Sequence, residues 1–167
     1  DILVDELLQR IAYSLFRPIE NRLLRKAARI ISTSPNQACF SEALKRFAPK
    51  VEIIPLMVPD EWGKATPEDE GAARRIRGEY GTPLVLFVGR LVAYKGVSSL
   101  ISAVPKVPGA SFLIVGDGPL EAELRKQAAE QRVADRVHFL GRMPNRKPYY
   151  MACDLLVLPS VYALEMF

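Results

Sequence analysis

Apolar residues form four short runs in the second half of the chain. The runs occupy residues 83–88, 111–115, 136–140 and 154–158. They show no regular alternation with polar residues, which is typical of strands buried on both faces in a parallel sheet. Between the runs, apolar positions at helical spacing predict helices near residues 96–106, 119–132 and 145–152. This repeated strand-helix unit predicts an α/β fold, with helices on both faces of a Rossmann-like parallel sheet.

The first third of the chain has a different pattern, with a longer helical stretch and shorter strands. Residues 3–29 carry apolar positions at helical spacing, and Pro18 marks either a break or the first turn of a second helix. After it we expect a strand at residues 29–33, a helix from Pro35 to about Phe47 and a strand at residues 51–54.

A proline-rich connection separates these two parts of the chain. Pro55, Pro59 and Pro67 lie close together, which predicts a stiff and irregular segment. We therefore expect two domains, residues 1–60 and residues 61–167.

Glycines and charged residues follow the predicted strands of the second part. They are Gly89-Arg90, with Lys95-Gly96 shortly after, then Gly116-Asp117-Gly118, then Gly141-Arg142-Met143, and finally Pro159-Ser160. The carboxyl ends of parallel strands meet at one edge of a sheet, where open α/β folds bind their ligands. We therefore expect all four sets of loops to face one crevice.

Arg90 and Lys95 are the strongest candidates for ligand contacts. Both lie between a buried strand and the start of a helix, where a guanidinium and an ammonium can neutralise phosphoryl oxygens. The pair predicts a cradle for a diphosphate. Gly116, Asp117 and Gly118 have an alternative interpretation, because glycine and aspartate after a strand also make tight turns.

Two further side chains have the right chemistry for a site. Glu165 lies just after the last predicted strand, where its carboxylate could accept hydrogen bonds from sugar hydroxyls. Its alternative is an ordinary exposed acid in a loop. His138, the only histidine, lies within a strand rather than in a loop, and we interpret it as structural.

Common nucleotide-binding motifs are missing from these loops. A dinucleotide fingerprint needs a third glycine three residues after Gly118, but that position is Glu121, whose charge opposes a pyrophosphate. The sequence also contains no Gly-x-x-x-x-Gly-Lys-Ser/Thr run. These absences argue against nicotinamide and flavin enzymes and against phosphate-loop nucleotidases.

Composition limits the class of protein further. The 167 residues are 49% hydrophobic and 25% charged, as in globular proteins. The net charge of +4 is shared evenly by the two parts, so neither is a nucleic-acid arm. Cys39 and Cys153 show no metal-ligand spacing, so we expect no metal site and no disulfide. No apolar run approaches the roughly 18 residues of a membrane span, and a cytoplasmic location fits this pattern.

A basic stripe in the first helical segment has two interpretations. Arg22, Arg25, Lys26 and Arg29 recur at helical spacing beside an apolar face. The simpler interpretation is the solvated face of an ordinary surface helix. The alternative is a peripheral contact with the anionic lipids of a membrane surface.

In order and spacing, the loop motifs resemble the nucleotide-sugar half of retaining GT-B glycosyltransferases of family 4. The motifs are Gly89-Arg90 with Lys95-Gly96, Val115-Gly116-Asp117-Gly118-Pro119, Phe139-Leu140-Gly141, and Pro159-Ser160 with Glu165-x-Phe167. The resemblance covers residues 83–167 and, loosely, residues 20–60, which look like the end of that family's N-terminal, acceptor-binding domain. It implies transfer of a sugar from a nucleotide-diphosphate donor to an unidentified acceptor, with retention and without a metal or other cofactor.

The resemblance also implies roles for individual residues. Arg90 and Lys95 would stabilise the diphosphate leaving group, as a cation pair does in a dry cleft. Glu165 would contact the transferred sugar as the first glutamate of the family's Glu-x7-Glu motif, whose second position falls beyond Phe167. Gly116 and Gly118 would allow close approach of the backbone to the ligand. Residues 141–143 would lie near the nucleobase.

Two departures from the family pattern matter. Where the family often has Pro-Asn-Gly-Val-Asp, this chain has Pro55-Leu56-Met57-Val58-Pro59-Asp60, and the glycine-rich loop and acceptor site of the N-terminal domain are missing. We therefore expect the 167 residues to be a fragment without activity of its own. Two alternatives remain open: a non-catalytic nucleotide-binding domain that keeps the same crevice, and a sugar-nucleotide epimerase on a similar fold.

Overall fold

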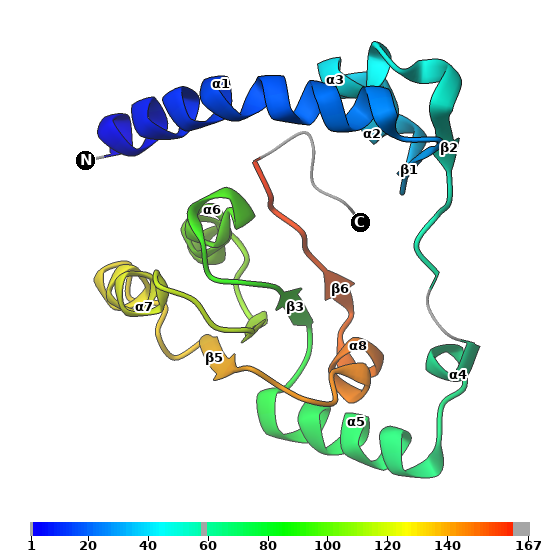
Figure 1. Cartoon of the computed structure of the whole chain (residues 1–167). Coiled ribbons are helices and arrows are strands. Elements are labelled where there is room, and N and C mark those ends of the chain that lie inside the picture. The colour runs from blue at the N-terminus through cyan, green and yellow to red at the C-terminus, as the bar shows by residue number, and fades with distance from the viewer. Residues whose placement is uncertain (1, 58–59, 162–167) are drawn as a thin grey trace. The chain divides into compact units, whose positions relative to one another are not determined.

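The computed structural model describes residues 2–57 and 60–161, which form two compact units (Figure 1). The first unit ends at Met57 and the second follows it, so the division falls inside the proline-rich connection. This connection is less irregular than expected, because helix α4 (Asp60–Gly63) forms one turn within it.

The first unit begins with a single long helix, α1 (Ile2–Lys26). The predicted break at Pro18 is wrong. Proline removes one helical hydrogen bond, and the helix continues on both sides of it. At the other end, Lys50 Nζ donates hydrogen bonds to the carbonyls of Arg25 (2.7 Å) and Ala27 (2.9 Å). Carbonyls at the end of a helix have no partner within it, so these bonds secure its last turn.

Two short parallel strands complete the framework of the first unit. Strand β1 (Ile30–Ser32) pairs with β2 (Val51–Ile53), with Ile30 opposite Val51. Between them lie α2 (Pro35–Phe40), α3 (Glu42–Lys45) and the 3-10 turn η1 (Ala48–Lys50). The single helix predicted from Pro35 to Phe47 is therefore wrong. Ser41 interrupts it, because the Ser41 hydroxyl accepts a hydrogen bond from the Leu44 amide (3.3 Å) and so caps a new helix.

The second unit repeats a strand-helix pattern around one parallel sheet. Its remaining elements are α5 (Pro67–Tyr80), β3 (Leu84–Val88), η2 (Ala93–Lys95), α6 (Val97–Ala103), η3 (Val104–Lys106), β4 (Ser111–Val115), α7 (Glu121–Glu130), β5 (Val137–Gly141), α8 (Lys147–Ala152) and β6 (Leu155–Leu156). The strand order is β5-β4-β3-β6, and every pairing is parallel. The predicted α/β class is confirmed.

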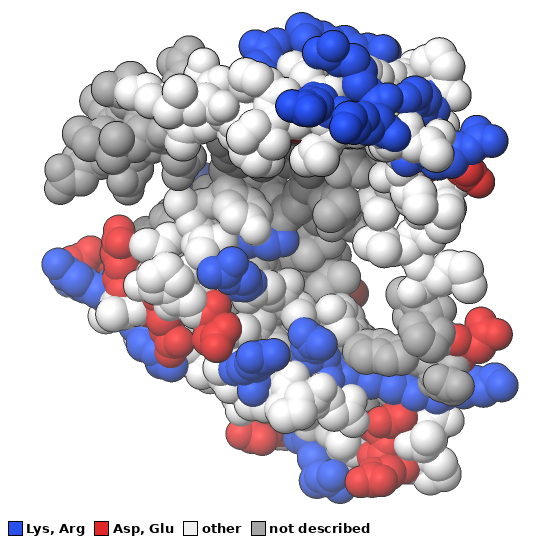
Figure 2. All heavy atoms as spheres, viewed as in Figure 1, with Lys and Arg blue, Asp and Glu red and all other residues white. Residues whose placement is uncertain are grey.

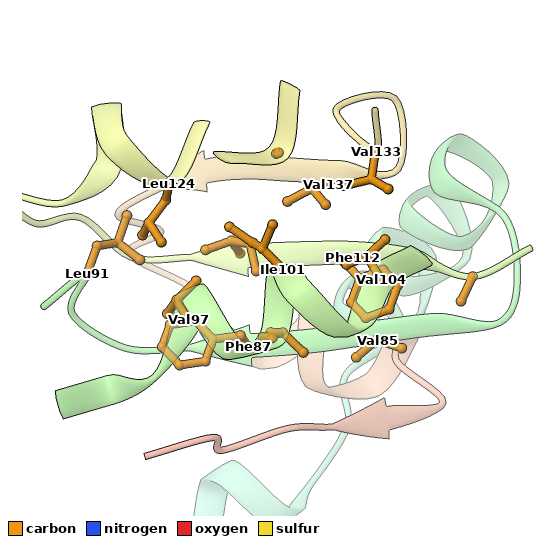
Figure 3. Packing of buried hydrophobic residues seen from close by; sticks show 14 residues of the cluster. Val85, Phe87, Leu91, Val97, Ile101, Val104, Phe112, Leu124, Val133 and Val137 are labelled. Carbon is orange, nitrogen blue, oxygen red and sulfur yellow. The ribbon is translucent and has the colours of Figure 1, made fainter. Parts of the chain in front are cut away.

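The core lies on both faces of this sheet, and Figure 3 shows the cluster on the face that α6 and α7 cover. Val85 and Phe87 of β3 pack on one face with residues of α6 and α7, such as Ile101 and Leu124. The alternate β3 residues, Leu84 and Leu86, pack on the other face with Ala73 of α5 and Ala152 of α8. Successive side chains of a strand point to opposite faces, so the unbroken apolar run of β3 is explained by the two layers of helices.

Strand β6 departs from the prediction of a fourth buried strand over residues 154–158. Only Leu155 and Leu156 pair with β3, and their side chains are 56% and 42% exposed. Among the described strands, β6 pairs with β3 alone and so lies at the edge of the sheet. An apolar run predicts a strand, but it does not reveal which strand will be at an edge.

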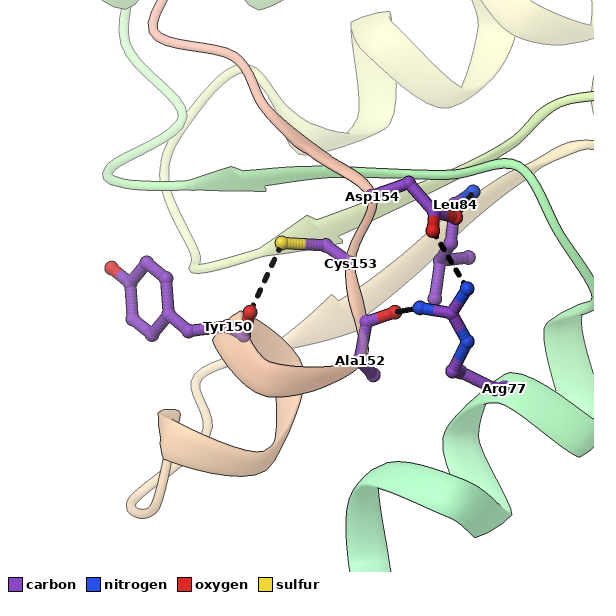
Figure 4. A network of polar contacts seen from close by, with 6 residues as sticks. All are labelled: Arg77, Leu84, Tyr150, Ala152, Cys153 and Asp154. Carbon is purple, nitrogen blue, oxygen red and sulfur yellow. Dashed lines mark hydrogen bonds and ion pairs between the residues drawn. The ribbon is translucent and has the colours of Figure 1, made fainter. Parts of the chain in front are cut away.

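A polar network ties the beginning of β6 to the centre of the sheet (Figure 4). Asp154 accepts hydrogen bonds from the Leu84 amide (2.7 Å) and from Arg77 of α5 (2.6 Å). The other guanidinium nitrogen of Arg77 donates to the Ala152 carbonyl (2.6 Å). The Leu84 amide and Arg77 together lower the pKa of the Asp154 carboxyl. The network fixes the start of β6 beside the start of β3, so the two strands end at the same edge of the sheet.

Candidate functional site

The loops that follow β3 and β4 are joined by backbone hydrogen bonds. The Gly89 amide donates to the Val115 carbonyl (3.0 Å), and the Leu91 amide donates to the Asp117 carbonyl (2.8 Å). The Gly116 amide in turn donates to the Gly141 carbonyl (2.8 Å) at the end of β5. Three loops from three neighbouring strands therefore form one connected framework at the carboxyl edge of the sheet.

Glycine at position 116 is required by this close packing. Its φ angle is +137°, and a Cβ atom there would lie 1.8 Å from the Gly89 carbonyl oxygen. At Gly118 a Cβ atom would lie 2.4 Å from the Leu91 carbonyl oxygen. Both glycines thus allow one loop to approach another. The ligand contacts expected for the two glycines stay a prediction.

The loop after β6 joins the same edge through the loop after β3. The Val161 amide donates to the Tyr94 carbonyl (2.9 Å). Gly96 has a φ angle of +68°, and a Cβ atom there would lie 2.0 Å from the Pro159 carbonyl oxygen. All four predicted sets of loops therefore end at one edge, as the parallel arrangement requires.

A cleft of about 380 Å³ opens between three of these loops. Its lining residues are Val88, Gly89, Arg90, Val115, Gly116, Asp117, Arg142, Met143 and Arg146. Six predicted site residues are thus brought together: Gly89, Arg90, Gly116, Asp117, Arg142 and Met143. Five others lie at the same edge but do not line the cleft: Lys95, Gly96, Gly118, Gly141 and Ser160. Glu165 lies outside the described residues.

The cleft carries an excess of positive charge. Arg90, Arg142 and Arg146 are exposed, and their guanidinium groups make no hydrogen bond or ion pair with a described residue. Asp117 is the only acidic side chain among the lining residues. Several arginines elsewhere in the unit are paired; Arg77, for example, lies 2.6 Å from Asp154, and Arg125 lies 2.8 Å from Glu121. Like charges gathered without partners repel one another, so this arrangement favours an anionic ligand.

Arg146 was not predicted as a site residue. The helix predicted at residues 145–152 includes Arg146. In the structure α8 begins at Lys147, and Arg146 is its N-cap residue. The sequence contains one indication of its place: Arg146 lies five residues after Gly141, and therefore in the loop that leaves β5. The direction of its side chain could not be inferred from that distance.

A buried ion pair holds the start of α8 in place. Lys147 Nζ lies 3.0 Å from Asp69 Oδ2, and the two side chains are only 14% and 11% exposed. Lys147 also donates a hydrogen bond to the Lys64 carbonyl. Asp69 accepts in addition from the Thr66 amide (3.2 Å) in the capping box of α5. The hydrogen bond from Lys147 is the main cause that lowers the pKa of Asp69 to about 2. The loop that ends at Arg146 is therefore anchored on α5.

Lys95 and Ser160 occupy neighbouring positions outside the cleft lining. Lys95 ends η2, and its Nζ lies 5.5 Å from the centre of the Tyr94 ring. The Ser160 hydroxyl is buried and has no hydrogen-bond partner among the described residues. A buried hydroxyl without a partner is unusual, so Ser160 remains a candidate for a ligand contact.

His138 and the acidic residues give no sign of a metal site. His138 packs against the ring of Tyr80 (centroids 4.8 Å apart), and burial lowers its pKa. It does not line the cleft. Within residues 2–57 and 60–161, no group of three or more histidine, cysteine, aspartate or glutamate side chains could hold a metal ion.

The parallel sheet, its two layers of helices and the cleft at its carboxyl edge form a Rossmann-like arrangement, which matches solved structures of the GT-B glycosyltransferase class. A solved structure of this class, Alr3699/HepE from Anabaena in complex with UDP, matches with a TM-score of 0.74 and 25% identity over 88% of this chain and 42% of that chain. Residues 82–166 match the family model described as "Glycosyl transferases group 1", and the chain belongs to this family.

Curated relatives extend the match to nearly the whole chain. The O-antigen chain mannosyltransferase C of Escherichia coli is 31% identical over 161 residues, covering 95% of this chain and 42% of that protein. The D-rhamnosyltransferase WbpZ of Pseudomonas aeruginosa is 36% identical over 170 residues, covering 98% of this chain and 42% of that protein. The chain thus spans about two fifths of the length of these relatives.

Proposed function

We propose that the chain is the donor-binding part of a glycosyltransferase, which moves a sugar from a nucleotide-diphosphate donor to an acceptor. The observation that carries this proposal is the cleft at the carboxyl edge of the sheet, where the guanidinium groups of Arg90, Arg142 and Arg146 make no hydrogen bond or ion pair with a described residue. A nucleoside diphosphate supplies the negative charge that such a cleft favours. The Anabaena neighbour in complex with UDP and the sugar-transferring relatives support the same function.

The roles that we propose for the residues combine their positions with the family resemblance. Arg90 binds the diphosphate and, together with Lys95 from η2, stabilises the leaving group. The backbone of Gly89 and Gly116 lines the cleft closely enough to contact the phosphates. Gly141, Arg142 and Met143, at the end of β5, lie on the side of the nucleobase. The buried hydroxyl of Ser160, without a partner among the described residues, and Glu165 contact the remainder of the donor.

The proposal extends to the two parts of the chain. Residues 1–60 form the end of an acceptor domain, and residues 61–167 form the donor domain. Transfer proceeds with retention, as in family 4, and requires no cofactor, because the nucleotide-diphosphate sugar is the donor substrate. From the 167 residues alone we expect nucleotide binding rather than sugar transfer, because they contain no glycine-rich acceptor loop. The identities of the relatives argue against the epimerase alternative.

Calorimetric titration with UDP, GDP and ADP tests the proposed donor site. We expect at least one of the three to bind, with one site for each chain. Addition of a divalent metal chelator is expected to leave the affinity unchanged, since the described residues hold no metal-ligand cluster. Failure of all three nucleotides to bind the folded chain would refute the proposal. A non-catalytic nucleotide-binding domain would bind in the same way, and only an assay of sugar transfer with a full-length protein separates the two.

We also propose that α1 makes a peripheral contact with an anionic membrane surface. Its apolar side chains Leu15, Ile19 and Leu23 are 74%, 55% and 61% exposed. Arg22 and Lys26 follow on the same side of the helix at intervals of three and four residues. Figure 2 displays the lysines and arginines gathered on one face of the first unit. A helix with exposed apolar residues beside basic ones suits the interface of an anionic bilayer.

Co-sedimentation with lipid vesicles tests this contact. We expect the chain to sediment with vesicles that contain phosphatidylglycerol and not with vesicles of phosphatidylcholine alone. The double variant Leu15→Ser, Ile19→Ser is expected to lose most of this binding. No helix among the described residues is long and apolar enough to span a membrane. Equal sedimentation with both kinds of vesicle, or with neither, would contradict an electrostatic contact with the membrane. The exposed apolar residues of α1 would then be interpreted as a surface that packs against protein.

A further inference from the structure

The cleft has two ends that are built by different strands. Arg90 follows β3, whereas Arg142, Met143 and Arg146 follow β5, and β4 lies between these strands. Neighbouring strands are about 4.8 Å apart, so the origins of the two loops are separated by about 10 Å. Arg90 and Arg146 therefore enter the cleft from opposite ends. An extended ligand that fills the cleft meets Arg90 at one end and Arg146 at the other.

The β5 end of the cleft is suited to a flat, aromatic group. Met143 is partly buried and packs against the core on the α5 and α8 face of the sheet. A thioether held in this way offers an apolar, polarisable surface. The Arg146 guanidinium, which makes no hydrogen bond or ion pair with a described residue, is planar and can stack on an aromatic face or donate to its polar edge.

The backbone of Arg146 is fixed even though its side chain is exposed. Its carbonyl accepts hydrogen bonds from the amides of Tyr149 (3.1 Å) and Tyr150 (3.2 Å). The next residue, Lys147, is anchored by Asp69 and by the Lys64 carbonyl. A side chain on a fixed backbone loses less entropy when it binds a ligand than one on a mobile loop. Arg146 is therefore prepared for a specific contact.

We infer that Arg146 contacts the nucleobase of the donor and helps to determine which base is accepted. The inference rests on the proposed function and extends it, because it assigns a base-selecting role to a residue outside the motifs of the loop. Arg90 and Arg146 then divide the ligand between them. Arg90 binds the phosphates, which all donors share, and Arg146 binds the base, which distinguishes them.

The test compares ligands that share the phosphates and differ in the base. The affinities of UDP, GDP, ADP and the base-free ribose 5-diphosphate are measured for the full chain and for Arg146→Gln and Arg90→Gln. For Arg146→Gln we expect the affinity of the preferred nucleotide to fall by about 5- to 30-fold. The affinity of ribose 5-diphosphate should not change, so the preference for one base becomes smaller. For Arg90→Gln we expect all four ligands to weaken by a similar factor.

Several outcomes would overturn the inference. If Arg146→Gln weakens ribose 5-diphosphate as much as the nucleotides, Arg146 is a phosphate ligand. If it changes no affinity, Arg146 makes no contact with the donor. If the unmodified chain binds none of the four ligands, the proposed function itself fails, which is a different result. The thermal midpoint of Arg146→Gln should equal that of the unmodified chain, because the exposed guanidinium has no hydrogen-bond or ion-pair partner among the described residues.

Discussion

Replacing Arg90 by glutamine is expected to weaken the binding of nucleoside diphosphates by about 10- to 100-fold. A hydrogen bond to a charged group contributes about 1.5–3 kcal/mol, and each 1.4 kcal/mol corresponds to about a tenfold change in affinity. Glutamine keeps a polar side chain of similar reach but removes the charge. Calorimetry with the nucleotide that binds the unmodified chain measures the effect. The difference should become smaller as salt is added, because ions screen an exposed charge.

The matched control for Arg90 is Arg75→Gln. Arg75 is an exposed arginine on α5, a helix that contributes no residue to the lining of the cleft. This variant removes the same charge from the same unit, so any effect of net charge alone should appear in both variants. We expect Arg75→Gln to bind with an affinity close to that of the unmodified chain. Equal losses in the two variants would show that Arg90 acts only through the general field of the protein.

The second large effect is expected for Gly116→Ala. The new methyl group would lie 1.8 Å from the Gly89 carbonyl oxygen, far inside the contact distance, so one of the two loops must move. Overpacking typically costs about 1–3 kcal/mol, and a side chain at positive φ costs about 1–2 kcal/mol more. We therefore expect the free energy of unfolding to fall by roughly 3 kcal/mol. Urea unfolding measures the loss. Nucleotide binding should weaken as well, because both loops line the cleft.

Gly109→Ala separates the two causes of this loss. Gly109 also has a positive φ angle, +80°, but a Cβ atom there would meet no other atom within 4 Å. We expect it to cost only the backbone strain of about 1–2 kcal/mol and to leave nucleotide binding unchanged. If Gly116→Ala were no more destabilising than Gly109→Ala, the close contact between the two loops would have no energetic importance.

The layered sheet could be predicted from the sequence because it depends on the burial of apolar runs. Runs such as residues 84–88 and 111–115 lack polar alternation, and this pattern requires helices on both faces. The edge position of β6 could not be predicted in the same way. Leu155 and Leu156 continue the apolar pattern, yet they lie beside only one strand and remain exposed. Local sequence determines that a strand forms, whereas its neighbours are determined by the whole fold.

The sequence predicted those residues of the cleft that directly follow a strand. It did not predict Arg146, whose place in the cleft depends on the direction of its side chain. Arg90 and Arg142 follow directly after strands, so the edge of the sheet determines where they lie. Arg146 lies farther from its strand, and the anchor between Lys147 and Asp69, which come from distant parts of the sequence, holds the end of its loop. Gly118 also depends on the folded arrangement of two loops, since its missing side chain leaves room for the Leu91 backbone, which follows a different strand.

The charged side chains of the cleft take no part in packing the core, so they can change without disturbing the sheet. Arg90, Asp117, Arg142 and Arg146 are exposed, and none of them belongs to either core cluster. Substitutions at these positions are expected to cost little stability, because surface changes away from packed or bonded groups are usually nearly neutral. A library of variants at these four positions could therefore be searched for new ligand preferences while the scaffold stays constant. The same freedom would allow natural descendants of this domain to exchange one anionic ligand for another through a few substitutions, without rebuilding the fold.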